Sequence, residues 1–384
     1  MAAAALGSTA LVLGLLMTRM GTTRLRPAIA ADVIVLTGSF GRGHDAAAES
    51  IAQDLRSEGR TVQVLDVVAL MPARSGELLK WVYFQQLRHA PITWQRTLSV
   101  LERHDGALQR LYLAAIRLLI AGPIARSVTP WTRHIISTHP FASGALGELR
   151  AAGCLDGIGT STYLCDPSVH PMWIHPAVDR HLALYPVAAQ QARARGAQSV
   201  DLVAPAGSIS RPEATRSSLA RDRDDADIRP TALVVGGSEG VGDLEQCALE
   251  LLATGLVRPV IVCGRNTALH ARMRTMAGVD VHGWVDDLPG LMSRCDLLVN
   301  NAGGATTVEA LRSGLPIVFY RPLAGHGREN AAALEKEGLA LWPRDAVELP
   351  ACLEQALAGA MSSKPDWGSR PAAVAGLSRA AGAA

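Results

Sequence analysis

Short apolar runs alternate with helix-like stretches from Asp32 onward, and this alternation constrains the fold more than any other feature of the sequence. Such alternation is typical of βαβ units with a parallel sheet. The first half of the chain contains expected strands at 33–38, 62–68, 134–138, 161–166 and 181–186, the last of which is expected to close a sheet. The second half contains expected strands at 231–237, 260–264, 279–283, 295–301 and 315–320. The sequence therefore predicts an α/β fold with two doubly wound, Rossmann-like sheets.

The chain has 384 residues, which is long enough for two separate cores. We expect an N-terminal domain at 31–205, a polar linker at 206–229, a C-terminal domain at 230–360 and a low-complexity tail at 361–384. Residues 1–30 begin with an apolar run that has no basic residues ahead of it and is shorter than the roughly 20 residues of a spanning helix. This segment is expected to be either a weak membrane anchor or the product of a start codon placed too early.

Charge and cysteine content narrow the function classes. A net charge of +2 argues against a nucleic-acid partner. The six cysteines form no CxxC pair, and the spacing of His170, His175 and His181 fits no zinc motif. We therefore expect neither a metal site nor a cofactor.

The segment 74–133 differs in composition from the rest of the chain. It has nine Lys or Arg residues against three acidic ones, and six of the sixteen aromatic residues of the chain. A basic, aromatic and amphipathic segment can lie in the interface of an anionic membrane. The alternative is an ordinary helical subdomain whose aromatic side chains belong to the core.

Three glycine-rich turns follow apolar runs, at 38–44, 236–243 and 301–307. Each places a helix N-terminus at the carboxyl edge of a sheet, where anions and ligands bind. In the first turn, Gly41, Gly43 and Ala46 match a dinucleotide-binding pattern, which leaves an oxidoreductase as an alternative. His44 stands where a pyrophosphate would need a small residue, and a histidine suits a general base better.

The last turn predicts a nucleotide site. Gly303 and Gly304 allow close approach to the backbone, and Thr306 and Thr307 offer hydroxyl groups at a helix start. Glu309 is expected two to three residues inside that helix, where a carboxylate can accept hydrogen bonds from a ribose diol. The alternative for Glu309 is a first-turn acid that interacts with the helix dipole.

Several blocks of the chain, in order, carry a family resemblance: TGSFGRGHDAAAESI, STHPFASGAL, DPSVHPMWIHPAVDRH, GGSEG, VIVCGRN, GWVDDLPGLMSRCDLLVNNAGGATTVEALRSGLPIVFY and PLAGHGREN. They resemble the GT-B glycosyltransferases that include monogalactosyldiacylglycerol synthase, processive diacylglycerol glucosyltransferase and the lipid-linked muramyl-pentapeptide N-acetylglucosaminyltransferase. The resemblance runs from about Val33 to Trp342. It implies two Rossmann-like lobes that face each other across a cleft. It further implies inverting transfer of a hexose from a UDP-sugar to a lipid acceptor, with diacylglycerol as the expected acceptor, at the membrane surface.

The resemblance also implies roles for single residues. The donor side comprises Gly237, Ser238, Arg265, Asn266, Val285, Gly303, Gly304, Thr306, Thr307, Glu309, His326 and Asn330. Gly237, Ser238, Gly304 and Thr306 would meet the phosphates, Val285 the uracil, Glu309 the ribose, and His326 and Asn330 the sugar hydroxyls. The acceptor side comprises Gly41, Gly43, His139, His170 and Trp173. His44 is the first candidate for the catalytic base and Asp166 is the second. Asp166 could instead orient His44, and both alternatives stay open.

Two departures from the family pattern affect these expectations. The usual glutamine-containing pair that faces the donor sugar is His326-Gly327 here, so the choice of hexose stays open, and the turn between the lobes lacks its proline at Gly207-Ser208-Ile209. The remaining alternatives are a UDP-sugar 2-epimerase of the same fold and a glycosyltransferase that acts on a small secondary metabolite. The expected location is the cytoplasm, peripheral on the inner face of the membrane.

Overall fold

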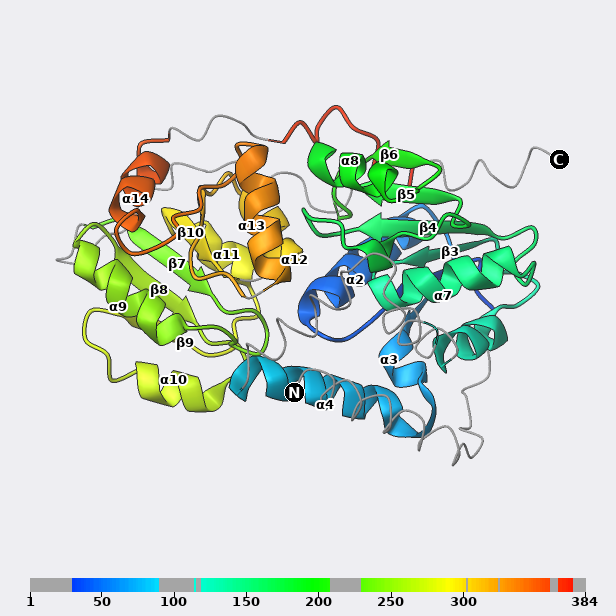
Figure 1. Cartoon of the computed structure of the whole chain (residues 1–384), viewed down its shortest axis with the longest axis horizontal. Coiled ribbons are helices and arrows are strands. Elements are labelled where there is room, and N and C mark those ends of the chain that lie inside the picture. Colours follow the sequence, from blue (N-terminus) through cyan, green and yellow to red (C-terminus); the bar gives the residue numbers. More distant parts are fainter. Residues whose placement is uncertain are drawn as a thin grey trace. The chain divides into compact units, whose positions relative to one another are not determined.

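The computed structural model describes residues 30–89, 114, 119–207, 229–301, 303–323, 325–359 and 365–375. The chain divides into two compact units, one formed by residues 1–210 with 367–384 and the other by residues 211–366. Each unit contains one parallel sheet with its helices (Figure 1). The expected α/β architecture with two Rossmann-like units is confirmed.

The N-terminal unit contains a sheet of six parallel strands in the order β2-β1-β3-β4-β5-β6. Its strands are β1 (Val33–Thr37), β2 (Val62–Asp66), β3 (His134–Ser137), β4 (Gly159–Leu164), β5 (Arg180–Ala183) and β6 (Val200–Leu202). Its helices are α2 (Arg42–Ser57), α3 (Val67–Leu70), α4 (Ser75–His89), α7 (Pro140–Ala151) and α8 (Pro186–Ala194), with 3-10 turns η1 (Pro72–Arg74) and η2 (Pro171–Trp173). The expectation that the strand at 181–186 closes the sheet was wrong. The edge strand β6 was missed because its three half-buried residues include a charged Asp201 and form no apolar run.

The C-terminal unit contains five parallel strands in the order β11-β10-β7-β8-β9. They are β7 (Thr231–Val235), β8 (Arg258–Val262), β9 (Asp280–His282), β10 (Leu297–Asn300) and β11 (Ile317–Phe319). The helices are α9 (Leu244–Thr254), α10 (Thr267–Met273), α11 (Leu288–Met292), α12 (Gly304–Arg312), α13 (His326–Lys336) and α14 (Leu349–Leu357).

The strand order of each sheet reverses direction at one point, between β1 and β3 in the first sheet and between β7 and β10 in the second. The loops that leave two such strands diverge to opposite sides, so the carboxyl edge is open there and ligands of α/β proteins bind at this point. The loop to α2 and the start of α7 flank the first reversal point. The glycine-rich turns at 236–243 and 301–303 flank the second.

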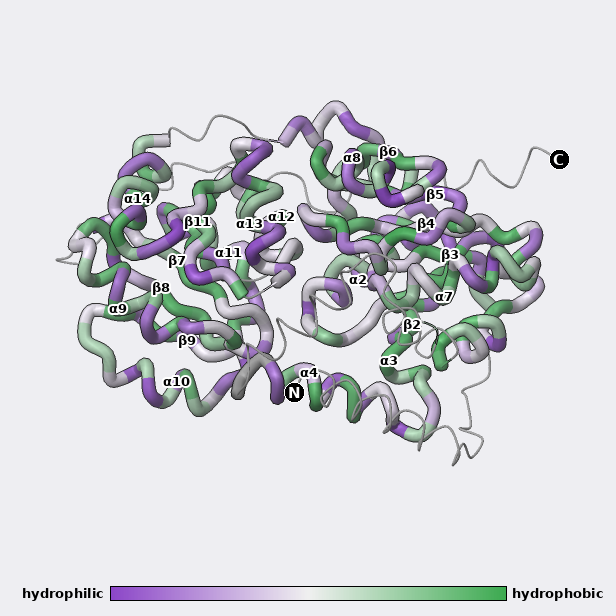
Figure 2. Tube along the Cα trace, in the orientation of Figure 1, coloured by the Kyte–Doolittle hydropathy of each residue, from purple (hydrophilic) through white to green (hydrophobic). Residues whose placement is uncertain are grey.

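The segment 74–133 is described in part, and residues 90–113 lie outside the described residues. At its end, Leu119, Ile120 and Ile124 belong to the buried core of the N-terminal unit. Near its start, hydrophobic and hydrophilic residues alternate along α4 (Figure 2), and Trp81 is 59% exposed. The core interpretation thus holds for the end of the segment, and the membrane-interface interpretation of its start stays a prediction.

The expected low-complexity tail includes an ordered piece. Trp367 is buried, its indole nitrogen donates a hydrogen bond to the carbonyl of Leu184 at 3.1 Å, and its ring lies 6.1 Å from that of Tyr185. Ala372 forms a parallel bridge with Ala204. Residues 367–375 therefore complete the N-terminal unit, which composition alone did not indicate.

Residues 1–29 and 208–228, which cover most of the expected N-terminal segment and linker, lie outside the described residues. Among the helices that the structure describes, none is both long enough and apolar enough to span a bilayer.

Candidate functional site

His44 lies in the first turn of α2, at the carboxyl edge of the N-terminal sheet. Its Nδ1 is 2.8 Å from the backbone carbonyl oxygen of Thr138, the residue that follows β3. A carbonyl can only accept, so Nδ1 carries the hydrogen, and in the neutral ring Nε2 keeps its lone pair. The hydroxyl of Thr138 returns a hydrogen bond to the carbonyl of His44 at 3.1 Å. The two connections across the reversal point fix the ring in the orientation in which Nε2 is the basic nitrogen.

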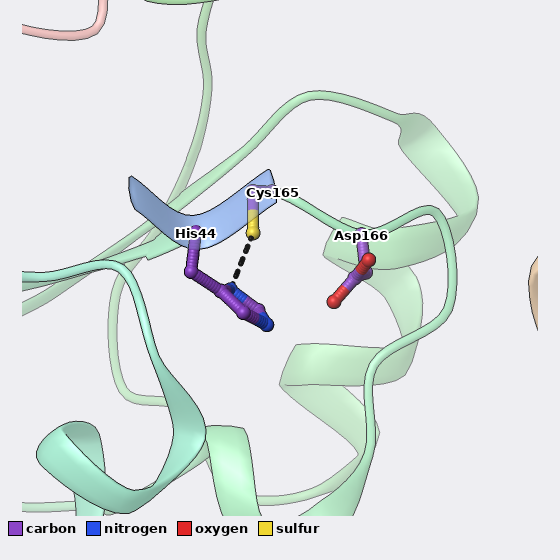
Figure 3. Close-up of side chains that lie close together, drawn as sticks. All are labelled: His44, Cys165 and Asp166. Carbon is purple, nitrogen blue, oxygen red and sulfur yellow. Dashed lines mark hydrogen bonds between the residues drawn. The ribbon is translucent and has the colours of Figure 1, made fainter. Parts of the chain in front are cut away.

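Cys165 and Asp166 follow β4 and lie beside this imidazole (Figure 3). The Cys165 sulfur is 3.3 Å from His44 Nδ1. Burial, together with the Asp166 charge, raises the pKa of the Cys165 thiol well above its usual value, so the thiol stays protonated. Asp166 is buried, and its carboxylate points toward the same space as the imidazole ring. A carboxylate in this place can stabilise an imidazolium that forms when His44 takes up a proton.

A wall of aromatic rings surrounds His44. The ring of His139 lies 4.7 Å from that of His44, and the ring of Phe40 stacks on His139 at 5.5 Å. Burial, and the nearby His44, lower the pKa of His139 well below its usual value. His139 is therefore neutral near pH 7, and its Nδ1 accepts a hydrogen bond from the backbone of Phe141 at 3.2 Å. His139 shapes the site as a neutral ring.

Tyr83 of α4, which belongs to the basic aromatic segment 74–133, contacts this wall. Its ring contacts Phe40 edge-on at 5.4 Å. Burial, with a smaller contribution from Asp166, raises the pKa of Tyr83 to about 12, so the phenol stays protonated. Sequence reasoning missed Tyr83 and Cys165, because neither belongs to a recognisable motif and only the fold brings them to His44.

The other expected acceptor residues differ in their exposure. Gly41 and Gly43 lie half-buried at the start of α2. Trp173 is 1% exposed, 5.7 Å from the His44 ring, and His170 is buried and accepts a hydrogen bond from the backbone of Met172 at 3.2 Å. Both side chains are therefore buried, and their contact with an acceptor stays a prediction.

In the C-terminal unit, the turns after β7 and β8 are connected by hydrogen bonds. The carbonyl of Ser238 accepts a hydrogen bond from the backbone of Arg265 at 2.8 Å. Asn266 uses both ends of its amide: Oδ1 accepts from the Leu269 backbone at 3.0 Å, and Nδ2 donates to the Gly240 carbonyl at 3.2 Å. Asn266 therefore stabilises the loop that carries Gly237, and a contact of its side chain with a nucleotide stays a prediction.

Helix α12 begins earlier than the sequence suggested. Its first residue is Gly304 and its N-cap is Gly303, so Glu309 is half-buried in the second turn. The alternative that Glu309 complements the helix dipole loses support, because that effect fades beyond the first turn. Thr306 is half-buried in the first turn.

Two further donor-side residues, Thr307 and Asn330, are buried, and their contact with the donor stays a prediction. Thr307 is fully buried, and its hydroxyl accepts from Asn300 at 3.0 Å and donates to Gly303 at 3.4 Å, so it is used inside the protein. Asn330 is 1% exposed, so its amide also lies in the interior, while His326 is half-buried at the first position of α13.

An exposed aromatic residue lies next to Val285. Trp284 is 42% exposed, and the guanidinium of Arg265 lies 4.6 Å above its ring. The Trp284 indole donates to Asp286 at 2.8 Å. Sequence reasoning named Arg265 and Val285 but not this tryptophan, although a tryptophan beside a polar, glycine-flanked turn was a usable signal.

The donor atoms of His44, Cys165 and Asp166 lie within 4.8 Å of one another and could hold a metal ion. Coordination by the Cys165 sulfur would require that the thiol lose its proton, which its raised pKa opposes. The expectation of no metal site came from other histidines and did not consider this group.

Known proteins match this chain over most of its length. The family model of monogalactosyldiacylglycerol synthase matches residues 44–205, and that of the glycosyltransferase family 28 C-terminal domain matches residues 231–382. Chloroplastic monogalactosyldiacylglycerol synthase of Spinacia oleracea is 26% identical over 88% of this chain and 68% of its own. The processive diacylglycerol beta-glucosyltransferase of Bacillus cereus strain G9842 is 25% identical over 85% of both chains. The chain spans 63% of monogalactosyldiacylglycerol synthase 1 of Arabidopsis thaliana.

Solved structures show the same fold. MurG of Acinetobacter baumannii superposes with a TM-score of 0.56 at 17% identity, over 90% of this chain and 98% of its own. The spinosyn rhamnosyltransferase SpnG, solved with spinosyn aglycone, gives a TM-score of 0.58 at 14% identity with the same coverage. Both are two-lobed glycosyltransferases of the GT-B fold, which these similarities confirm for this chain.

Proposed function

Since this chain belongs to the GT-B glycosyltransferase family of monogalactosyldiacylglycerol synthase and processive diacylglycerol glucosyltransferase, we propose that it transfers a hexose from a UDP-sugar to a hydroxyl group of diacylglycerol, with inversion at the anomeric carbon. The product would be a β-linked glycolipid and UDP. The observation that carries this proposal is the orientation of His44, which leaves a basic nitrogen at the carboxyl edge of the N-terminal sheet.

In the proposed reaction, Nε2 of His44 accepts the proton of the acceptor hydroxyl. The acceptor oxygen then forms a bond to C1 of the sugar, and the bond between C1 and the diphosphate oxygen breaks with both electrons on UDP. The proton remains on the imidazole, where the nearby Asp166 carboxylate stabilises the positive charge. Asp166 thereby assists the base. The protonated Cys165 thiol, 3.3 Å from Nδ1, has no role in this step.

The proposed donor site uses helix N-termini for the negative charge of the diphosphate. Within the described chain, α12 and α13 begin after Gly303 and Gly325, and neither glycine has a side chain to cap the first turn. Helix α10, by contrast, is capped by Asn266. The backbone N–H groups of an uncapped first turn favour an anion and stabilise the charge that develops on the leaving group.

We also propose that the enzyme works at the surface of an anionic membrane, on the inner face. Helix α4 supports this, because one of its residues, Tyr83, lies at the aromatic wall while Trp81 and Leu78 are exposed. The exposed pair is one helical turn apart and so shares one face. A lipid could be drawn from the bilayer by the same helix that borders the base.

The test incubates the purified protein with vesicles that contain diacylglycerol and with UDP-galactose, UDP-glucose or UDP-N-acetylglucosamine in turn. Lipid extracts are analysed by mass spectrometry, and the anomeric configuration of any product by NMR. A β-glycosyl diacylglycerol with one donor is the expected result. The absence of glycolipid with every donor, or an α-linked product, would contradict the proposal.

The same incubation separates the alternatives. A UDP-sugar 2-epimerase would change the sugar nucleotide in the absence of vesicles. A glycosyltransferase for small metabolites would leave the vesicles unmodified but consume the donor when soluble alcohols are offered.

A further inference from the structure

Arg321 follows β11 directly and has an unusual backbone conformation. Its φ angle is +47°, in the left-handed region that residues other than glycine rarely adopt. Such a residue keeps this conformation only when its surroundings hold it, and strained positions of this kind gather at functional sites. Arg321 begins the segment that leads to His326 and α13.

The guanidinium of Arg321 holds this conformation through a forked contact. Nε and Nη2 each donate to one oxygen of Glu250 at 2.7 Å, and Nη1 donates to Asp243 at 2.8 Å. The Tyr320 hydroxyl donates to the same carboxylate at 2.6 Å. The hydrogen bonds from Arg321 lower the pKa of Glu250 to about 2, so this carboxylate is charged at any physiological pH.

The fork joins two loops of the proposed donor site. Asp243 ends the glycine-rich turn 236–243, and Arg321 opens the turn that precedes α13. A second connection runs through Asn301, whose Nδ2 donates to the Val241 carbonyl at 3.2 Å and whose carbonyl accepts from the Leu323 backbone at 3.0 Å. The glycine-rich turns that contain Val241 and Asn301 are therefore connected to each other and to the turn that begins at Arg321.

An arginine beside a diphosphate site would ordinarily be taken for a phosphate ligand, because its planar fork suits phosphate oxygens. In Arg321 the fork and the remaining nitrogen are already directed at two carboxylates. We propose that Arg321 is a positioning residue, and that its ion pair with Glu250 presets the donor loops 236–243 and 321–326 before the donor binds. This inference rests on the proposed function for the identity of the donor.

The test compares Glu250→Gln and Arg321→Lys with the control Glu245→Gln. Glu245 lies on the same helix, α9, and pairs with exposed Arg272 at 3.0 Å, away from the donor loops. Arg321→Lys keeps the charge but cannot form the fork. We expect both test variants to raise the calorimetric Kd for UDP and the donor KM about tenfold with little change in kcat, because misplaced binding groups lose complementarity. The control should keep wild-type values.

A second measurement needs no ligand. Hydrogen–deuterium exchange of the free protein should be faster at the amides of Leu323 and Val241 in Glu250→Gln than in Glu245→Gln. If the exchange rates and UDP affinities of folded Glu250→Gln match those of the control, the inference is overturned. Loss of UDP affinity in Arg321→Lys with full affinity in Glu250→Gln would make Arg321 a direct phosphate ligand and also overturn it. A wild-type protein that binds no UDP would contradict the proposed function. The exchange experiment would still test whether the ion pair between Arg321 and Glu250 presets the loops.

Discussion

A single backbone carbonyl decides what His44 can do. Thr138 presents its carbonyl oxygen 2.8 Å from Nδ1, and this contact selects the tautomer in which Nε2 is basic. The contact depends on the pairing of β1 with β3, since His44 and Thr138 follow these strands and are far apart in the sequence. The sequence alone identifies His44 as a candidate base, but the tautomer of its ring depends on the fold.

Replacement of His44 by alanine should lower kcat by roughly a hundredfold or more, in line with the usual contribution of a general base. The Kd for UDP should stay near the wild-type value, because the donor is expected to bind the other unit. Asp166→Asn should reduce kcat less than His44→Ala. If Asp166→Asn lowers kcat as much as His44→Ala or more, the carboxylate is the base. Steady-state kinetics measures kcat, and calorimetry measures the Kd for UDP.

Gly38 is required by the packing around His139. A Cβ atom at this position would lie 2.6 Å from the His139 ring, and the ring of His139 contacts that of His44. Gly38→Ala should therefore destabilise the protein by roughly 1 to 3 kcal/mol, as overpacking does, and lower kcat. At Gly41 a Cβ would meet nothing within 4 Å, so Gly41→Ala should leave thermal unfolding nearly unchanged. Equal melting temperatures for the two variants would contradict this account.

At the scale of elements, α4 has one face that packs on the aromatic wall and one face that is exposed. Tyr83 packs at the aromatic wall, whereas Trp81 is 59% and Leu78 37% exposed on the outside. Tryptophan and leucine at the surface of a basic helical segment are typical of binding at a membrane interface. The composition of the segment suggested this, but only the structure separates its buried residues from its exposed ones.

We expect Trp81→Ser combined with Leu78→Ser to weaken binding to vesicles of phosphatidylglycerol by roughly tenfold, because less apolar surface enters the interface. Leu249→Ser is the matched control, since Leu249 is 49% exposed on α9 in the other unit. Cosedimentation measures both. If the double variant binds like the control, α4 does not dock on the bilayer.

At the scale of the whole molecule, the chain returns to the unit in which it began. Trp367 and Arg370 both donate to the carbonyl of Leu184, and the indole packs against Tyr185. The end of the described chain is therefore part of the N-terminal core.

Trp367→Ala should lower the free energy of unfolding of the N-terminal unit by roughly 3 kcal/mol, the usual cost of deleting a buried aromatic side chain. Truncation after residue 375 should have little effect, because it retains Trp367 and the bridge between Ala372 and Ala204. Differential scanning calorimetry distinguishes the two proteins. A melting profile of Trp367→Ala that matches the truncated protein would contradict a structural role for this segment.

Acid should destabilise the same unit. Burial, with the charge of Arg180 as a smaller cause, lowers the pKa of His134 to about 4, and burial lowers that of His181 to about 4. Both side chains stay neutral in the folded protein while those of the unfolded chain take up protons near pH 6.5. Stability is therefore full above about pH 6.5 and falls as the pH drops toward 4, by up to about 3 kcal/mol for each histidine.

Urea unfolding between pH 7.5 and 4.5 would measure this loss. His181→Leu should flatten the pH dependence, because one of the two buried imidazoles is removed. An unchanged slope in this variant would show that other groups control the acid sensitivity.

Most of the strands, the two-unit division and the positions of His44 and Asp166 could be predicted from the sequence, because apolar periodicity and glycine-rich turns are local signals. Strand β6 and the ordered tail could not, because neither has an apolar pattern of its own and both depend on an existing sheet edge. The start of α12 was predicted too late, so Glu309 lies deeper in the helix than expected.

The tertiary structure alone decided which polar groups remain available. Asn266, Thr307 and Asn330 lie in segments with the expected motif. The side chains of Asn266 and Thr307 form hydrogen bonds within the protein, and Asn330 is buried. Conversely, Cys165, Tyr83 and Arg321 reach the two proposed sites through contacts between segments distant in the sequence. The sequence by itself determined the fold and the kinds of side chain at the two sheet edges. The packing of one loop against another determined their tautomers, partners and exposure, because those depend on distances that no local pattern encodes.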